Sequence, residues 1–172
     1  MRDFAKFVSK YFKGRIDLVG VEVGVFRGDN AIEIYNIIKP LLLVLVDCWN
    51  PVGLGYFDGN DKGQSEENFL TTYRAHVNNK GVVILKAWSD EAAHLLSGVR
   101  FDFGYVDGNH CYLNCKQDLV CWYPLIKEGG IFGGHDYNMK GVSMAVKEVF
   151  PEGKVSIGSG EAGVDWWVTK NG

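Results

Sequence analysis

The stretch that decides the fold of this chain is Val21-Glu22-Val23-Gly24-Val25-Phe26-Arg27-Gly28-Asp29-Asn30-Ala31. An apolar run that holds one acid is followed by two glycines, and the sequence then favours a helix. A parallel strand that turns into a helix in this way places a crevice at its own carboxyl end. Glycines let a ligand approach the main chain, and the start of a helix presents unpaired N–H groups. The stretch therefore predicts a ligand-binding turn.

Strand and helix patterns alternate on both sides of this turn. Amphipathic spacing predicts helices at residues 4–12, 29–39, 65–77, 89–96, 113–126 and 142–150. Asp29 is the expected N-cap of the second of these. Apolar runs predict strands at residues 17–24, 41–46, 82–85, 101–106, 130–134, 154–157 and 166–169. We expect one α/β domain over residues 1–172. Its sheet should be doubly wound, mostly parallel and seven-stranded, with helices on both faces and a C-terminal antiparallel hairpin.

The charge and composition of the chain exclude several classes of partner. The formal net charge is −3, and there is no block of Lys and Arg. We therefore expect neither a nucleic acid nor an anionic membrane as a general partner, since both require a positive patch. No run reaches the roughly 18 apolar residues of a membrane span, and no signal-peptide core is present, which predicts a cytoplasmic protein. The oligomeric state stays open, with a homodimer as one option.

The cysteines of the chain do not predict a structural metal site. Cys48, Cys111, Cys115 and Cys121 contain no C-x-x-C pair. His110 with Cys111 and Cys115 can be drawn as a zinc set, but its spacing differs from that of structural zinc sites. We favour reduced thiols that pack as small apolar groups.

One long loop is predicted, at residues 48–64, and it contains Trp49 and Tyr56. Long loops in compact domains are typically lids or binding elements. We expect this loop to close over a bound ligand and exclude water.

The predicted parallel strands deliver polar residues to one edge of the sheet, the carboxyl edge, where doubly wound folds bind ligands. Asp47 closes the second strand, where a carboxylate can accept hydrogen bonds from ribose hydroxyls; a capping role is the alternative. Ser89 follows the third strand, where it can read an adenine edge or cap the next helix.

The fourth and fifth strands end in the richest set of side chains. Asp107 with His135-Asp136 predicts a site for Mg²⁺ or another divalent ion, with Mn²⁺ and Fe²⁺ as candidates. The alternative is a hydrogen-bonded Asp–His pair without metal. His110 is a candidate general base because its unperturbed pKa of about 6.5 lies near working pH, and a surface histidine is the alternative.

Four segments of the chain resemble class I S-adenosylmethionine-dependent methyltransferases. Residues 21–28 resemble the first motif of that class. Residues 101–112 resemble the D-G-D-H-x-Y segment of a bacterial group, similar to methyltransferase domain family 24, that includes macrocin-type O-methyltransferases and cephalosporin-hydroxylase-like proteins. Residues 118–130 and 134–137 continue the resemblance in the same order.

The resemblance implies a Rossmann-like methyltransferase fold and an enzyme that methylates a hydroxyl of a small molecule, such as a sugar. The residues expected at S-adenosylmethionine are Glu22, Gly24, Gly28, Asp47, Trp49, Ser89 and Asp107. The resemblance also implies a metal on Asp107, His135 and Asp136, with Asp107 or His110 as the proton acceptor. Asn109 and His135 stand where relatives often carry acids, which lowers the negative charge of the expected metal site.

Two other functions are compatible with the turn. A non-catalytic module that binds S-adenosylmethionine or a nucleotide would keep the pocket without transferring a methyl group, and the short chain and the replaced acids favour it somewhat. A nicotinamide-dependent dehydrogenase is disfavoured, because acid-x-Gly-x-x-x-Gly lacks the middle glycine of the dinucleotide pattern G-x-G-x-x-G.

Overall fold

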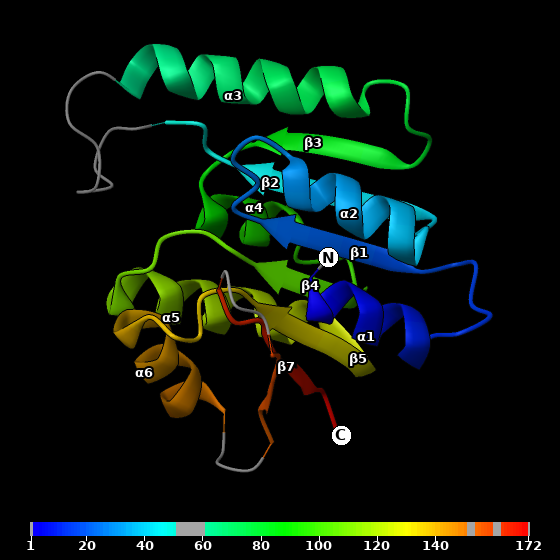
Figure 1. The fold of residues 1–172 in the computed structure, drawn as a ribbon, viewed down its shortest axis with the longest axis vertical. Helices are drawn as coiled ribbons and strands as arrows, with labels where there is room; N and C mark the ends of the chain where they lie inside the picture. The colour runs from blue at the N-terminus through cyan, green and yellow to red at the C-terminus, as the bar shows by residue number, and fades with distance from the viewer. Residues whose placement is uncertain (1, 51–60, 151–153, 160–162, 172) are drawn as a thin grey trace.

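The computed structural model describes residues 2–50, 61–150, 154–159 and 163–171, with the backbone alone for residues 61–64 (Figure 1). Seven strands form one sheet in the order β3-β2-β1-β4-β5-β7-β6. They are β1 Val19–Val23, β2 Leu42–Asp47, β3 Val82–Lys86, β4 Phe101–Val106, β5 Ile126–Gly134, β6 Ser156–Ile157 and β7 Trp166–Thr169. The first five strands are parallel, and β7 pairs antiparallel with both β5 and β6. The predicted sheet and its hairpin are confirmed.

The helices cover both faces of this sheet. They are α1 Asp3–Tyr11, α2 Asp29–Ile38, α3 Asp61–His76, α4 Ser89–Leu95, α5 Tyr112–Trp122 and α6 Lys140–Val149, with a short 3-10 helix at Tyr123–Leu125. The core forms two layers, one under α1 and α2 and the other under α4, α5 and α6. No helix among the described residues is long and apolar enough to cross a membrane.

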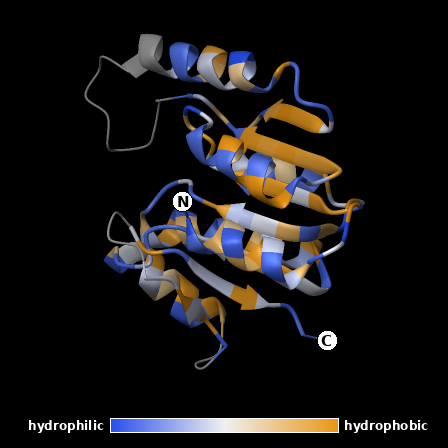
Figure 2. Ribbon diagram, turned by 45° about the vertical axis from the view of Figure 1, so that its right-hand side comes forward, coloured by the Kyte–Doolittle hydropathy of each residue, from blue (hydrophilic) through white to orange (hydrophobic). Residues whose placement is uncertain are grey.

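The unbroken apolar run of β2 is explained by burial on both faces. Leu43 and Leu45 belong to the core layer under α1 and α2, whereas Val44 and Val46 belong to the layer under α4 to α6. Side chains of a strand point alternately to its two faces, so a strand covered on both sides needs apolar residues at every position. Figure 2 shows β2 as largely hydrophobic and the hydrophilic residues mainly on helices and loops.

Several predicted helix starts are wrong by one to four residues. Gly28, with φ +83°, occupies the N-cap of α2, so Asp29 is its first residue rather than its cap. Trp88 occupies the N-cap of α4, which removes the capping role considered for Ser89. The helix expected from Ser65 begins at Asp61, so the predicted loop is shorter, and the part of it that holds Tyr56 lies outside the described residues.

The buried stripe of α3 is polar, contrary to the predicted apolar face. Asn68, Thr72 and His76 are buried, while Tyr73 and Val77 are about half exposed. Thr72 is tolerated in this stripe because its hydroxyl lies within hydrogen-bond distance of the carbonyl of Phe26 in the β1–α2 turn and of the carbonyl of Asn68 in α3, and buried polar groups are stable when they find partners. The hydrophobic period alone could not show this.

Candidate functional site

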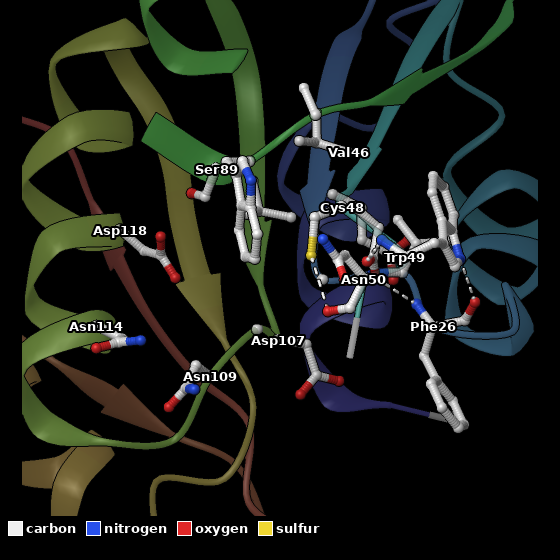
Figure 3. A pocket seen from close by; sticks show the side chains of 18 of the residues that line it. Phe26, Val46, Cys48, Trp49, Asn50, Ser89, Asp107, Asn109, Asn114 and Asp118 are labelled. Carbon is white, nitrogen blue, oxygen red and sulfur yellow. Dashed lines mark hydrogen bonds between the residues drawn. The ribbon is translucent and has the colours of Figure 1, made fainter. Parts of the chain in front are cut away.

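A cavity of about 800 Å³ opens at the carboxyl ends of β1, β2 and β4. The strand order reverses between β1 and β4, which is where ligands bind in open α/β sheets. Figure 3 shows Asn109, Asn114 and Asp118 on one side of the cavity, Phe26, Cys48 and Trp49 on the other, and Asp107 between them. The volume lies in the range of small-molecule and cofactor sites.

The β1–α2 turn forms one wall of this cavity, and its glycines serve close packing. Gly24 has φ +85°, and a Cβ there would lie 2.3 Å from the carbonyl oxygen of Asp107, so any other residue would separate β1 from the end of β4. Phe26 adopts φ +54° and is exposed, which is rare for an aromatic residue. Its carbonyl oxygen accepts hydrogen bonds from Trp49 Nε1 at 2.7 Å and Thr72 Oγ1 at 3.2 Å. Gly28 lies outside the cavity lining.

The carboxylate of Asp47 holds this turn in place. Its Oδ2 accepts hydrogen bonds from the backbone N–H groups of Val25 at 2.9 Å and Phe26 at 2.8 Å, and its Oδ1 accepts one from Trp49 at 2.7 Å. The alternative capping role is therefore present in the structure. Asp47 also lines the cavity, so its predicted contact with a ribose stays a prediction.

Trp49 forms part of the wall of the cavity. Its indole is 6% exposed and packs edge-on against Phe69, with ring centroids 5.1 Å apart. With the hydrogen bond from Nε1 to Phe26, this packing fixes the ring. The part of the predicted loop that the structure describes thus begins with an anchored side chain.

Glu22 is the most deeply buried acid of the cavity wall, at 1% exposure. Its Oε1 accepts a hydrogen bond from Asn30 Nδ2 at 3.0 Å, whereas its buried Oε2 has no hydrogen-bond partner among the described residues. Burial raises the pKa of this carboxyl to about 8, and nearby Asp107 adds to the rise. The arrangement leaves one acceptor without a donor at the end of β1.

Four titratable side chains converge at the ends of β4 and β5. One ligand atom each from Asp107, His110 and Asp136 lies within 4.8 Å of the others. His110 Nε2 is 2.8 Å from Asp136 Oδ2 and 3.8 Å from Asp107 Oδ1. His135 Nδ1 is 3.2 Å from Asp136 Oδ1 and 3.8 Å from Asp107 Oδ1. The structure thus brings the three predicted metal ligands together and adds His110, although His135 and Asp136 lie outside the cavity lining.

His110 does not keep the ordinary pKa on which its predicted role as a base rested. Contacts with Asp107 and Asp136 raise its pKa to about 9, and hydrogen bonds from His110 and His135 lower the pKa of Asp136. At neutral pH the imidazole of this arrangement carries its proton. It therefore contributes positive charge between two carboxylates.

The opposite side of the cavity contains a buried acid that the sequence did not single out. Asp118 of α5 is 8% exposed, and burial raises its pKa to about 6. Ser89 donates a hydrogen bond that stabilises the Asp118 carboxylate, and its Oγ accepts one from Trp122 Nε1 at 2.9 Å. An acid among apolar helix positions was the available signal. The hydroxyl proton of Ser89 is directed to Asp118, but its oxygen keeps a second lone pair that can accept a hydrogen bond, so the predicted reading of adenine stays a prediction.

Arg2, just before α1, is another lining residue that sequence reasoning missed. Its Nη1 donates hydrogen bonds to Tyr105 Oη at 2.5 Å and to Asp107 Oδ2 at 2.8 Å. Tyr105 in turn donates to Asp165 Oδ1 at 2.7 Å, and Asp165 accepts from the backbone N–H of Phe4. No local pattern could reveal this contact, because it joins positions that lie more than 100 residues apart.

Comparisons with known proteins agree with this geometry. A family model described as a methyltransferase domain matches residues 21–137. No curated protein matches the sequence. The fold is similar to that of the O-methyltransferase NovP, with a TM-score of 0.69, 15% identity, and 99% of this chain and 78% of that chain covered.

Two further solved structures share the fold. One is an O-methyltransferase from Bacillus cereus in complex with SAH, with a TM-score of 0.61, 13% identity, and 97% of this chain and 80% of that chain covered. The other is CalS11, a TDP-rhamnose 3'-O-methyltransferase, with a TM-score of 0.61, 16% identity, and 96% of this chain and 76% of that chain covered.

Proposed function

The chain belongs to the family of methyltransferase domains, and from this premise we propose that it transfers the methyl group of S-adenosylmethionine to a hydroxyl oxygen of a small molecule. The class of enzyme, an S-adenosylmethionine-dependent methyltransferase, follows from the family. The transfer to a hydroxyl oxygen is proposed from the cavity at the point where the strand order reverses. Glu22 lies in this cavity at the end of β1, and Asp107 and His110 follow the end of the neighbouring strand β4.

The cofactor would lie across the ends of β1 and β2. Glu22 and Gly24 would face its amino-acid end, and Asp47 and Trp49 would face its ribose; all four line the cavity. Ser89 lies where the adenine would reach α4. The cavity of about 800 Å³ leaves room for an acceptor beside the cofactor, toward Asp107.

The reaction requires little covalent chemistry from the protein. A lone pair of the acceptor oxygen forms the new O–CH₃ bond while the S–CH₃ bond breaks and its electron pair returns to sulfur, giving S-adenosylhomocysteine. The protein mainly aligns the two reactants. The acceptor proton passes to the carboxylate of Asp107, because His110 already carries a proton at neutral pH.

A divalent metal fits the side chains that converge beside the cavity, at the ends of β4 and β5. Asp107, Asp136 and either histidine would hold it, and a mixed set of carboxylate and imidazole ligands suits Mn²⁺ or Fe²⁺ better than Mg²⁺. Such an ion would lower the pKa of the acceptor hydroxyl. Binding of the ion would remove the proton from the coordinating histidine.

A sugar or another natural-product-like hydroxyl is the acceptor class that we propose. CalS11, which shares the fold, acts on TDP-rhamnose, and NovP is also an O-methyltransferase. The polar amides Asn109 and Asn114 line the same side of the cavity and can hydrogen-bond sugar hydroxyls. We further propose a single catalytic domain that acts in the cytoplasm, without a nucleic acid or a membrane as partner.

Calorimetry with S-adenosylhomocysteine is the first test, followed by methyl transfer from labelled S-adenosylmethionine to a panel of sugars, nucleotide sugars and phenols. We expect micromolar cofactor binding and transfer to at least one hydroxyl acceptor. Parallel reactions with EDTA, Mn²⁺ and Mg²⁺ test the metal. Absence of cofactor binding at millimolar concentration would contradict the proposal, and binding without transfer to any acceptor would favour a non-catalytic module.

A further inference from the structure

The wall of the cavity is strongly acidic, and among its described residues only two are arginines. The described lining residues with carboxylates are Glu22, Asp29, Asp47, Asp90, Glu91, Asp107 and Asp118, and those with guanidinium groups are Arg2 and Arg27. S-adenosylmethionine carries a sulfonium, an ammonium and a carboxylate. The first two suit an acidic wall, whereas the carboxylate requires a cation.

Arg2 is the arginine placed to supply that cation. It is part-buried, whereas Arg27 is exposed. Both hydrogen bonds that its side chain makes to described residues start from Nη1, so the Nε and Nη2 edge of the fork is available for a ligand. A guanidinium edge binds a carboxylate through two parallel hydrogen bonds.

Arg2 is also held rigidly. Its Cζ lies 5.6 Å from the centroid of the Tyr105 ring, and Tyr105 is fully buried and bonded to Asp165. The ion pair with Asp107 fixes the other side of the group at 2.8 Å. An arginine that is ordered before the ligand arrives loses little conformational entropy on binding.

Glu22 lines the same cavity as Arg2 and supplies the opposite charge preference. The charge of Arg2 acts on Glu22, since it opposes the rise in the pKa of that carboxyl. Glu22 Oε2 is buried, lacks a described partner and belongs to the cavity lining, so it can accept a hydrogen bond from an ammonium. An acid and an arginine in the lining of one cavity match the two charges of an amino acid.

We propose that Arg2 binds the carboxylate of the methionyl end of S-adenosylmethionine, opposite Glu22, which takes its ammonium. This inference rests on the proposed function, because it assigns a residue to the same cofactor. It makes the segment before α1 a part of the binding site. It also predicts that the protein distinguishes S-adenosylmethionine from its decarboxylated form.

Calorimetry with three probes tests the proposal. S-adenosylmethionine carries both charges, decarboxylated S-adenosylmethionine lacks only the carboxylate, and 5'-methylthioadenosine lacks the whole amino-acid end. We expect Arg2→Ala to weaken binding of S-adenosylmethionine about tenfold to a hundredfold, as for the loss of a charge-assisted hydrogen-bonded pair. Binding of the other two probes should change less than about threefold.

Three further variants make the result specific. Arg2→Lys keeps the charge but not the fork, and we expect a smaller loss with the same order of probes. Glu22→Gln should weaken both probes that carry the ammonium and spare 5'-methylthioadenosine. Arg27→Ala removes the other arginine of the wall and should leave the ratio of the two S-adenosylmethionine affinities unchanged.

The outcomes separate this inference from the proposed function. If Arg2→Ala and Arg2→Lys weaken all three probes equally, Arg2 supports the fold and the inference is wrong. If they change only the rate or the KM of the acceptor, Arg2 serves Asp107 instead, and the inference is again wrong. If the unmodified protein binds none of the probes, the proposed function itself fails, and the inference fails with it.

Discussion

At the amino end of β4, Asp102 is 3% exposed and accepts a hydrogen bond from the backbone N–H of Val19 at 2.8 Å, with Lys127 at 2.9 Å and Arg15 at 3.2 Å. At the carboxyl end of the neighbouring strand β1, Glu22 is equally buried but has one oxygen without a described partner. Buried acids are stable when cations and donors surround them. The contrast indicates that the amino edge of the sheet stabilises the fold, whereas the carboxyl edge leaves a buried hydrogen-bond acceptor for a ligand.

Backbone strain follows the same division. Three non-glycine residues with positive φ, namely Phe26, Trp49 and Asp136, lie at the carboxyl edge. Residues in sparsely populated backbone regions each cost on the order of 1–3 kcal/mol and cluster at ligand sites. Lys39, the fourth such residue among those described, ends α2.

The largest effect that the contrast predicts is the loss of activity on changing Asp107. Asp107→Asn should lower kcat by about 10²–10⁴-fold, because the amide cannot accept the acceptor proton. Asp17→Asn, an exposed acid at the amino edge, is the control and should keep full activity. Steady-state kinetics on the acceptor found in the panel measures both. An unchanged kcat for Asp107→Asn would remove Asp107 from the reaction.

The opposite end of the sheet should respond in stability alone. Asp102→Ala leaves Arg15 and Lys127 without their buried partner, and loss of one member of a buried ion pair costs about 3–5 kcal/mol. Both cations are about 40% exposed and can turn to water, so we expect the lower end of this range. Urea unfolding measures the free energy, and the Kd for S-adenosylhomocysteine should change less than twofold. A large change in that Kd would mean that the two edges are not independent.

Glu22 should make the ligand-free protein less stable as the pH rises. Its folded-state pKa of about 8 lies above the ordinary value of 4.5, so the folded protein binds the proton more tightly than the unfolded chain. The stability contributed by this group is therefore complete below pH 4.5 and is lost up to about pH 8, by roughly 3 kcal/mol at neutral pH. Glu22→Gln should remove this dependence in denaturant unfolding from pH 5 to pH 8. If the two proteins show the same slope, Glu22 is not the source of it.

The two edges also differ in how far the sequence could predict them. The positions of the strands, and their burial inside the sheet, could be predicted from apolar runs and glycine turns, since these signals are local. The positions of Asp47, Asp107 and Asp136 at one edge followed from the parallel arrangement alone. Their bonding partners did not, because local patterns carry no distances, and Arg2 reaches Asp107 only through the folded chain.

The polar stripe of α3 and the pKa of His110 were missed for a related reason. Thr72 is buried because it meets the carbonyl of Phe26, and His110 is protonated because Asp136 lies 2.8 Å away. Both depend on contacts between distant segments. Periodicity reports which face is apolar, but it does not report which polar group lies on the other side.

The smallest effect compares two glycines in the left-handed region, one at each edge. Gly14 has φ +89°, and a Cβ there would meet open space, whereas a Cβ on Gly28, with φ +83°, would lie 3.2 Å from Thr72 Oγ1. Gly14→Ala should cost about 1 kcal/mol of stability from the backbone alone. Gly28→Ala should cost about the same plus a shift of Thr72, which holds the carbonyl of Phe26 at the cavity. Only Gly28→Ala should therefore weaken S-adenosylhomocysteine binding, by a few fold in calorimetry. Equal binding by both variants would show that the turn tolerates this movement and that the wall of the cavity is less rigid than its hydrogen bonds suggest.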